Sequence, residues 1–148
     1  MNLAPREEDF LQHFTALSQR VPAGLARAAL ETAILRREAE GKFPFAQAMF
    51  FTREALEQAS SWEVSTYRAQ RFRPFRTLID LGCSIGGDTL ALASLAPTLG
   101  IDLDPLRLAM AQANLQALGL DGRAWFLRAD LRAPLPLTCF PSDSSFDI

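Results

Sequence analysis

The chain has 148 residues, of which 49% are hydrophobic and 22% are charged, so it can bury a core and is not disordered throughout. Its net charge of -2 is unevenly spread: residues 1–76 carry 11 basic and 9 acidic side chains, whereas residues 77–148 carry 4 basic and 8 acidic ones. The acidic second half argues against a surface that binds nucleic acid across the whole molecule, although a local basic patch is compatible with these numbers.

The residues that could bind a metal or form a disulfide are few and far apart. Cys83 and Cys139 are separated by 56 positions, and the single histidine, His13, is distant from both. This spacing predicts neither a metal site nor a disulfide framework. No apolar run approaches ~20 residues and the N-terminus has no signal pattern, so we expect a soluble cytoplasmic protein without membrane association.

Residues 1–72 are predicted to form a helical first domain. Pro5 with the acids after it is typical of a helix start, and Pro22 can open a second helix that ends near Gly41. A further helix begins near Trp62 and ends in a group of arginines, Arg68, Arg71, Arg73 and Arg76. Two interpretations stay open for this group: a solvated helix end, or a cationic site beside a pocket that attracts a phosphate-bearing substrate.

The segment 42–52 is rich in aromatic residues and is broken by Pro44. Its four phenylalanines are too apolar for an ordinary solvent-exposed loop, and they are Phe43, Phe45, Phe50 and Phe51. The segment is predicted to be core between the helical part and the following part, because phenylalanine is usually buried, and the alternative is a lid over a pocket. Thr52 is predicted to cap the next helix.

From residue 73 onward the pattern alternates between strands and helices, which defines a second predicted domain, 73–148. The expected strands are Thr77–Leu81, Thr98–Asp102 and Ala124–Arg128. Asp104 and Pro105 give the clearest helix start in the chain, as N-cap and first helical residue. Residues 131–144 are expected to form an irregular loop, and residues 145–148 to begin a fourth strand. Together these elements predict an α/β fold, with a Rossmann-like parallel sheet and right-handed crossovers.

Polar residues are expected to gather where the strands end. Gly82 and Gly86 follow the first strand, and the acids Asp80, Asp102 and Asp130 lie at the carboxyl ends of the first, second and third strands. In an open parallel sheet ligands bind outside these ends. A carboxylate after the second strand can accept hydrogen bonds from ribose hydroxyls, and one after the third can accept from an adenine amino group.

A nicotinamide-binding domain is the competing interpretation of this pattern. Such a domain also has an acid about 20 residues after its first glycine, and the interval from Gly82 to Asp102 satisfies that rule. However, its fingerprint is Gly-x-Gly-x-x-Gly, whereas position 84 is serine here. Asp80 and the pair Ala129–Asp130 have no role in that fingerprint, so this interpretation is the weaker one.

Three segments resemble motifs I, II and III of class I S-adenosylmethionine-dependent methyltransferases: Asp80–Gly87, Gly100–Pro105 and Phe126–Asp130. The nearer resemblance is to trimethylguanosine-synthase-like RNA methyltransferases and to bacterial methyltransferases with a THUMP-like domain. It extends over about residues 42–148, because a segment like Phe50–Glu54 also precedes the sheet in these proteins. The resemblance is specific for fold and cofactor and weak for the substrate.

The resemblance implies a set of S-adenosylmethionine-binding residues. Gly82, Ser84 and Gly86 would surround the methionine part, and Asp80 would organise the turn and bind the amino group. Asp102 would bind the ribose, Leu103 would pack on adenine and Asp130 would bind the adenine amino group. Cys83 and Thr52 complete the candidate set. Ser84 departs from the usual glycine and needs backbone angles that a residue with a Cβ can adopt.

The resemblance also implies a catalytic motif at the end of strand four, often Asp/Asn-Pro-Pro-aromatic, which would follow Ile148. We therefore expect the chain to be the N-terminal portion of a longer enzyme, with the cofactor-binding half but without the catalytic motif, and to be inactive alone. The alternative is a non-catalytic module that binds a cofactor or a partner. With strand order 3-2-1-4, the first strand would lie near an open edge, so we also expect a homodimer formed through that edge. The substrate implied by the resemblance is RNA.

Overall fold

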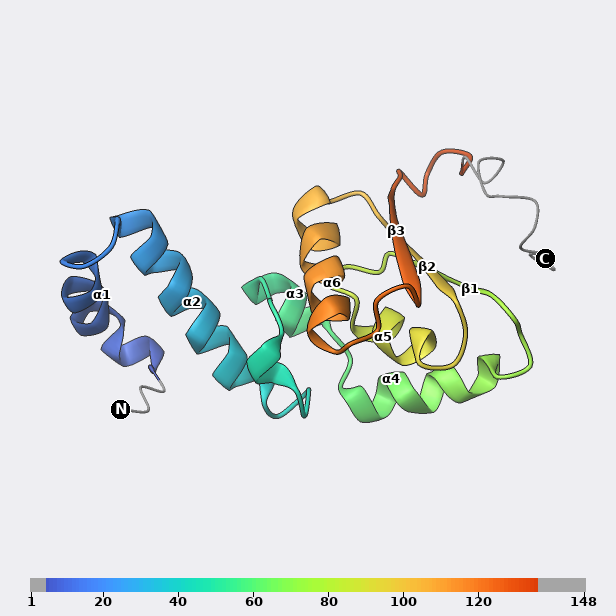
Figure 1. Ribbon diagram of the computed structural model, residues 1–148, viewed down its shortest axis with the longest axis horizontal. Coiled ribbons are helices and arrows are strands. Elements are labelled where there is room, and N and C mark those ends of the chain that lie inside the picture. Colours follow the sequence, from blue (N-terminus) through green and yellow to red (C-terminus); the bar gives the residue numbers. More distant parts are fainter. Residues whose placement is uncertain (1–4, 136–148) are drawn as a thin grey trace.

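The computed structural model describes residues 5–135, which form a helical arm followed by a layered α/β part. Figure 1 shows an elongated molecule, with α1 (Phe10–Ser18) and α2 (Ala23–Ala39) at one end and the sheet at the other. A short 3-10 turn, η1 (Glu7–Asp9), precedes α1. Pro22 stands immediately before α2, as expected from its preset φ angle. Two successive helices were predicted here, and the structure confirms them.

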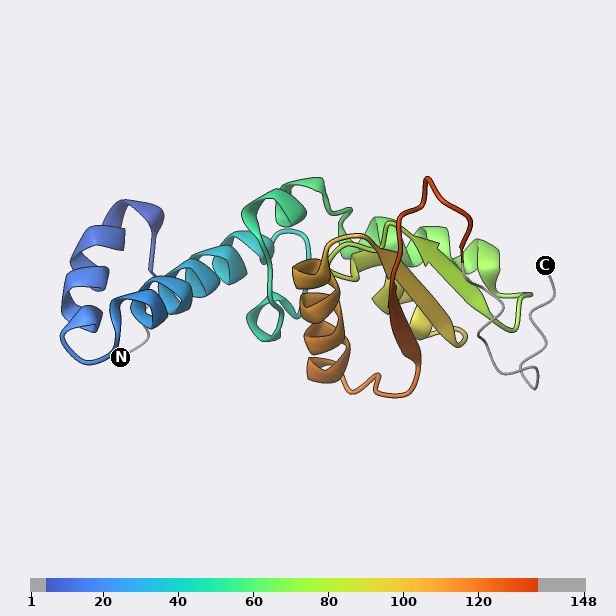
Figure 2. The same cartoon turned by 90° about the horizontal axis from the view of Figure 1, so that it is seen from above.

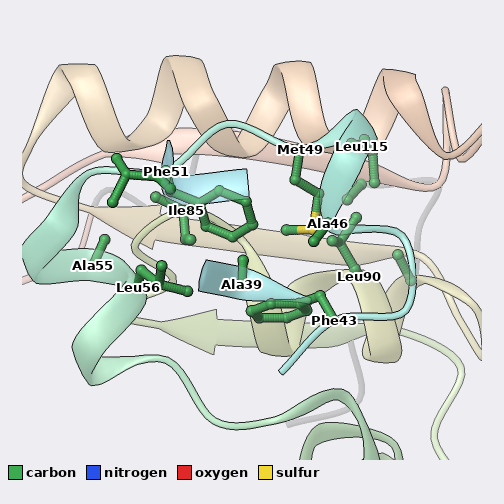
Figure 3. Packing of buried hydrophobic residues seen from close by; sticks show 13 residues of the cluster. Ala39, Phe43, Ala46, Met49, Phe51, Ala55, Leu56, Ile85, Leu90 and Leu115 are labelled. Atoms are coloured by element: carbon green, nitrogen blue, oxygen red, sulfur yellow. The ribbon is translucent and has the colours of Figure 1, made fainter. Parts of the chain in front are cut away.

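The aromatic segment joins the arm to the sheet and is mainly core. It contains the short turn η2 (Ala46–Ala48). Phe43 and Phe51 are almost completely buried, in a cluster that also contains Ile85, Leu90 and Leu115 (Figure 3). The prediction of core is therefore confirmed for these two rings. Phe50 differs, because 38% of its surface is exposed.

A buried asparagine holds the backbone at Phe50. Asn114 has no exposed surface, and its side-chain oxygen accepts a hydrogen bond of 2.6 Å from the Phe50 N–H. Its amide nitrogen donates to the carbonyl groups of Phe50 and Ile85. These three bonds pair both backbone groups of Phe50 and the carbonyl of Ile85, which stabilises the path of the segment between the arm and the sheet.

Two short helices follow, α3 (Arg53–Gln58) and α4 (Trp62–Ala69), and then the turn η3 (Gln70–Phe72). Each helix has a hydroxyl N-cap. The Thr52 hydroxyl accepts from the Ala55 N–H, as predicted, and the Ser61 hydroxyl accepts from the Val64 N–H. Helix α4 packs along α5 (Gly87–Ala93).

Three parallel strands form the sheet, in the order β1-β2-β3. They are β1 (Leu78–Leu81), β2 (Thr98–Asp102) and β3 (Ala124–Arg128), with α5 between the first two and α6 (Pro105–Ala117) between the last two. Figure 2 shows the sheet from above, with the arm extending away from it. The α/β class, the three strands and the helix that starts after Asp104 are confirmed. The predicted fourth strand at 145–148, and the end of the predicted loop at 131–144, lie outside the described residues.

Gly100 in the middle of β2 is required by packing. A Cβ at this position would lie 2.8 Å from the Phe126 ring and 3.0 Å from the Cys83 sulfur. The strand can therefore approach β3 and the turn after β1 only because the side chain is absent. The boundary at residue 72 between two domains stays a prediction. Among residues 5–135, no helix is long and apolar enough to cross a membrane.

Candidate functional site

The turn after β1 contains three residues with a left-handed backbone conformation. Gly82, Ser84 and Gly86 have positive φ angles of 79°, 50° and 87°. Glycine adopts such angles without steric cost, whereas a residue with a Cβ does so only at some expense. The N–H groups of Gly82 and Cys83 both donate to the Ile101 carbonyl, which anchors the turn to β2.

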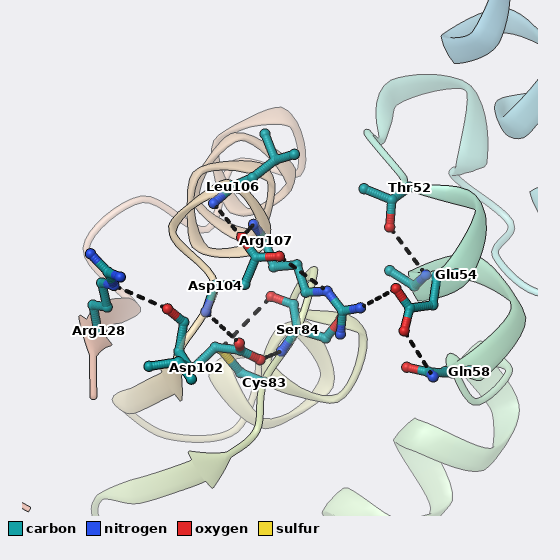
Figure 4. A network of polar contacts seen from close by, with 12 residues as sticks. Thr52, Glu54, Gln58, Cys83, Ser84, Asp102, Asp104, Leu106, Arg107 and Arg128 are labelled. Carbon is teal, nitrogen blue, oxygen red and sulfur yellow. Dashed lines mark hydrogen bonds and ion pairs between the residues drawn. The ribbon is translucent and has the colours of Figure 1, made fainter. Parts of the chain in front are cut away.

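Asp102 at the end of β2 holds this turn in place. One carboxylate oxygen accepts a hydrogen bond of 2.8 Å from the Ser84 N–H, and the other accepts one of 2.9 Å from the Asp104 N–H (Figure 4). These bonds explain how Ser84 is kept in a left-handed conformation. Because each carboxylate oxygen has two lone pairs, Asp102 can still accept hydrogen bonds from a ligand.

The Ser84 hydroxyl is the one polar side-chain group that is buried without a hydrogen-bond partner in residues 5–135. Burying a hydroxyl without a partner costs free energy. Ser84 also lines the pocket described below. A ligand that reached this hydroxyl would supply the missing hydrogen bond.

Asp80 at the end of β1 carries a carboxyl group with an unusual environment. Its Oδ2 accepts a hydrogen bond of 2.5 Å from the hydroxyl of Thr89, which is fully buried. Burial raises the pKa of Asp80 above its ordinary value, and the charges of Asp88 and Asp102 raise it further, while the Thr89 hydrogen bond opposes the shift. An ammonium group beside Asp80 would relieve the cost of this charge.

These residues line a pocket of about 430 Å³ at the carboxyl end of β1. The predicted site residues that line it are Asp80, Gly82, Cys83 and Ser84. It is closed on other sides by residues that the motifs did not include, among them Gln58, Ser60, Arg68, Asp88 and Arg107. Only Arg68 had a signal in the sequence, as part of the arginine group after Trp62. Of that group, it is the member that lines this pocket.

An ion pair connects the two helices on either side of the pocket. Arg107 near the start of α6 lies 2.9 Å from the Glu54 carboxylate on α3, and 3.6 Å from that of Asp104. Glu54 also accepts a hydrogen bond from Gln58. Figure 4 shows this chain of contacts running from α6 to α3. The pocket is thus bounded by elements from the preceding helical segment as well as by the sheet.

Five predicted site residues do not line this pocket: Gly86, Asp102, Leu103, Asp130 and Thr52. Leu103 lies just beyond β2 with 49% of its surface exposed. Asp130 forms an ion pair of 2.7 Å with Arg132, and hydrogen bonds from that arginine lower the pKa of Asp130. Thr52 lines a separate, larger hollow between α2 and α6.

Cys83 is not suited to act as a nucleophile. Its side chain is buried, and burial together with the nearby charges of Asp80 and Asp102 raises its pKa strongly. Only the thiolate is a good nucleophile. Its sulfur instead packs against Gly100 on β2. Within residues 5–135, no group of three or more histidine, cysteine or acidic side chains could hold a metal ion.

Comparison with known proteins finds a family match over the strand-and-helix part of the chain. Residues 75–144 match the family described as RNA cap guanine-N2 methyltransferase. An uncharacterized S-adenosylmethionine-dependent methyltransferase of Mycobacterium tuberculosis (strain CDC 1551 / Oshkosh) is 42% identical over 113 residues, which are 72% of this chain and 31% of that protein. Trimethylguanosine synthase of Schizosaccharomyces pombe is 34% identical over 55 residues, 36% of this chain and 23% of that protein.

A solved structure supports the fold. A candidate methyltransferase from Porphyromonas gingivalis W83 superposes with a TM-score of 0.64 at 20% identity, over 84% of this chain and 36% of that one. At this level of identity the likeness concerns architecture alone. The chain spans about a third of the length of the curated relative from Mycobacterium tuberculosis.

Proposed function

We propose that the chain, which is 42% identical over 113 residues to an S-adenosylmethionine-dependent methyltransferase, binds the amino-acid part of this cofactor in the pocket at the end of β1 and serves the methylation of RNA. The observation that carries the cofactor assignment is the set of groups around the turn 82–86. A buried hydroxyl without a partner at Ser84 and a carboxyl of raised pKa at Asp80 line one pocket. Both would gain hydrogen bonds from an amino-acid group.

The residues fit the cofactor in a consistent order. Asp80 would hold the ammonium group, and the Ser84 hydroxyl would donate to or accept from the methionine part. Asp102 would accept from the ribose hydroxyls with its remaining lone pairs, and the exposed Leu103 would cover the adenine. When bound, the cofactor supplies a methyl group on a sulfonium. The work of these residues is to fix its orientation, which is the main requirement of such a transfer.

RNA as the substrate is supported by the relatives. The matched family is described by an RNA cap activity, and one relative is a trimethylguanosine synthase. The excess of basic side chains in residues 1–76 is compatible with contact to an anionic substrate. The cytoplasm is the proposed compartment, since two distant cysteines suit a reducing environment.

Titration calorimetry with S-adenosylhomocysteine tests the cofactor assignment. We expect saturable binding to the chain, and about tenfold weaker binding to the Asp102→Ala variant, which loses acceptors for the ribose. The matched control is Asp121→Ala, since Asp121 is an exposed acid that does not line the pocket. Absence of measurable binding to the parent chain would contradict the cofactor assignment.

The substrate is tested separately, with S-adenosylmethionine that carries a labelled methyl group. Incubation with total RNA should place the label in RNA, and a digest would then identify the modified nucleotide. A non-catalytic cofactor-binding module is the second candidate. Cofactor binding without any transfer of label to RNA would support that candidate instead.

A further inference from the structure

The pocket at the end of β1 contains an arginine that no motif assigns. Arg68 lies in the last turn of α4, and its guanidinium donates a hydrogen bond of 3.0 Å to the Ser60 hydroxyl. The same nitrogen lies 3.5 Å from an Asp88 oxygen, at the upper end of hydrogen-bonding distance. Arg68, Ser60 and Asp88 all line the pocket, and so does Asp80. The pocket therefore presents both a carboxylate and a guanidinium.

Asp88 is held mainly by a different group. The hydroxyl of Ser65, which is buried one turn before Arg68 on α4, donates to the other Asp88 oxygen. Asp88 thus has a hydrogen bond that does not involve Arg68. The contact of 3.5 Å between Arg68 and Asp88 is weak, because a guanidinium binds a carboxylate best through two parallel hydrogen bonds.

Arg107 is the other arginine that lines the pocket, and its charge is already matched. It lies 2.9 Å from Glu54 and 3.6 Å from Asp104, so two carboxylates face it. Arg68 faces one carboxylate at a longer distance. An anionic ligand group would therefore be drawn to Arg68 rather than to Arg107.

We propose that Arg68 binds the α-carboxylate of the cofactor's amino-acid part while Asp80 binds its ammonium group. This assignment rests on the proposed cofactor function and adds a residue to it. Ser60, which also lines the pocket, accepts a hydrogen bond from this guanidinium and so helps to position it. The pocket then offers both charges that a zwitterion needs: the Asp80 carboxylate for the ammonium group and the Arg68 guanidinium for the carboxylate.

A comparison of two ligands separates this role from a structural one. S-adenosylhomocysteine carries the amino-acid group, whereas methylthioadenosine has the same nucleoside and sulfur but no carboxylate. In calorimetric titrations of Arg68→Gln, we expect about tenfold weaker binding of the homocysteine compound, since a charge-assisted pair is lost. The affinity for methylthioadenosine should stay within about twofold of the parent value. Arg68→Lys should give an intermediate loss, because the charge remains and the fork does not.

Arg71→Gln is the matched control, since Arg71 lies three residues later, is exposed and does not line the pocket. It should change neither affinity. Thermal melting of each variant shows whether the fold is kept. Equal weakening of both ligands by Arg68→Gln, or no weakening of either, overturns the assignment of Arg68 while leaving the cofactor function in place. A parent chain that binds neither ligand overturns both.

Discussion

Asp80 is the residue in which stability and function are most clearly opposed. Its carboxyl group is enclosed by the turn after β1 and raised in pKa by burial, yet it is placed at a pocket where a ligand cation would compensate it. Functional sites commonly contain such groups, because the charge that binds the ligand is costly in its absence. Thr89 offsets part of the cost through its hydrogen bond.

The variant Asp80→Asn should be more stable than the parent chain at neutral pH. The folded-state pKa of Asp80 is above the unfolded value, so its protonated form stabilises the fold at low pH, and this contribution is lost as pH rises through the folded pKa. Asparagine avoids that loss and still accepts from Thr89. We expect a gain of about 1 kcal/mol at pH 7 in urea denaturation, together with weaker binding of S-adenosylhomocysteine.

The pH dependence provides the control for this prediction. The fall in stability above the ordinary aspartate pKa should be smaller in Asp80→Asn than in the parent, whereas Asp121→Asn should keep the parent's slope. An unchanged slope in Asp80→Asn would contradict the assigned cause.

At the scale of elements, the packing of β2 depends on the absence of a side chain at Gly100. Gly100→Ala would place a methyl group within 3.0 Å of the Phe126 ring and the Cys83 sulfur, so a ring or the turn has to move. We expect a loss of about 1–3 kcal/mol in the free energy of unfolding, measured with urea, as for other overpacked cores. Gly24→Ala in α2 is the control, because nothing lies within 4 Å of its added Cβ and alanine favours a helix.

A compensating change sharpens the Gly100→Ala prediction. Phe126→Leu removes part of the ring that the new methyl group would meet. The double variant should be more stable than the sum of the two single effects predicts. Simple additivity would mean that the ring is not the source of the strain.

Elements whose signals are local could be predicted from the sequence. The helix after Asp104 has its cap and Pro105 in adjacent positions, and the strand after residue 77 is a short apolar run ended by a glycine, so both are confirmed. The pocket's other walls could not be predicted in this way. Arg107 and Glu54 meet only because α3 packs near the start of α6, and nothing in either local sequence encodes that encounter.

At the scale of the whole molecule, β1 forms an edge of the described sheet and pairs there with β2 alone. Ile79 and Leu81 on this strand are exposed, as are Phe72 and Phe75, which line a small hollow beside it. An exposed edge with apolar side chains is suited to pairing with another strand. We propose that a second copy of the chain pairs along β1, with antiparallel strands related by a two-fold axis.

Sedimentation at micromolar concentration tests this dimer. The parent chain should sediment as a dimer, and Ile79→Lys should sediment as a monomer, since a charged side chain on an edge opposes pairing. Leu11→Lys, which alters a more exposed leucine in α1, should remain dimeric. A monomeric parent would overturn the proposal.

The hydrogen bonds of Lys42 affect how the molecule can be chemically modified. It is the chain's single lysine, and its ammonium group donates to the carbonyls of Leu56, Glu57 and Ala59 at 2.7, 3.0 and 3.0 Å. These are carbonyl groups at and just beyond the end of α3, which a cation stabilises. Acylation of this amine, by an enzyme or by a labelling reagent, removes its charge and leaves one N–H in place of three, so at least two of these hydrogen bonds are lost at the end of α3. Isopeptide attachment at the single lysine therefore competes with the hydrogen bonds that hold the end of α3.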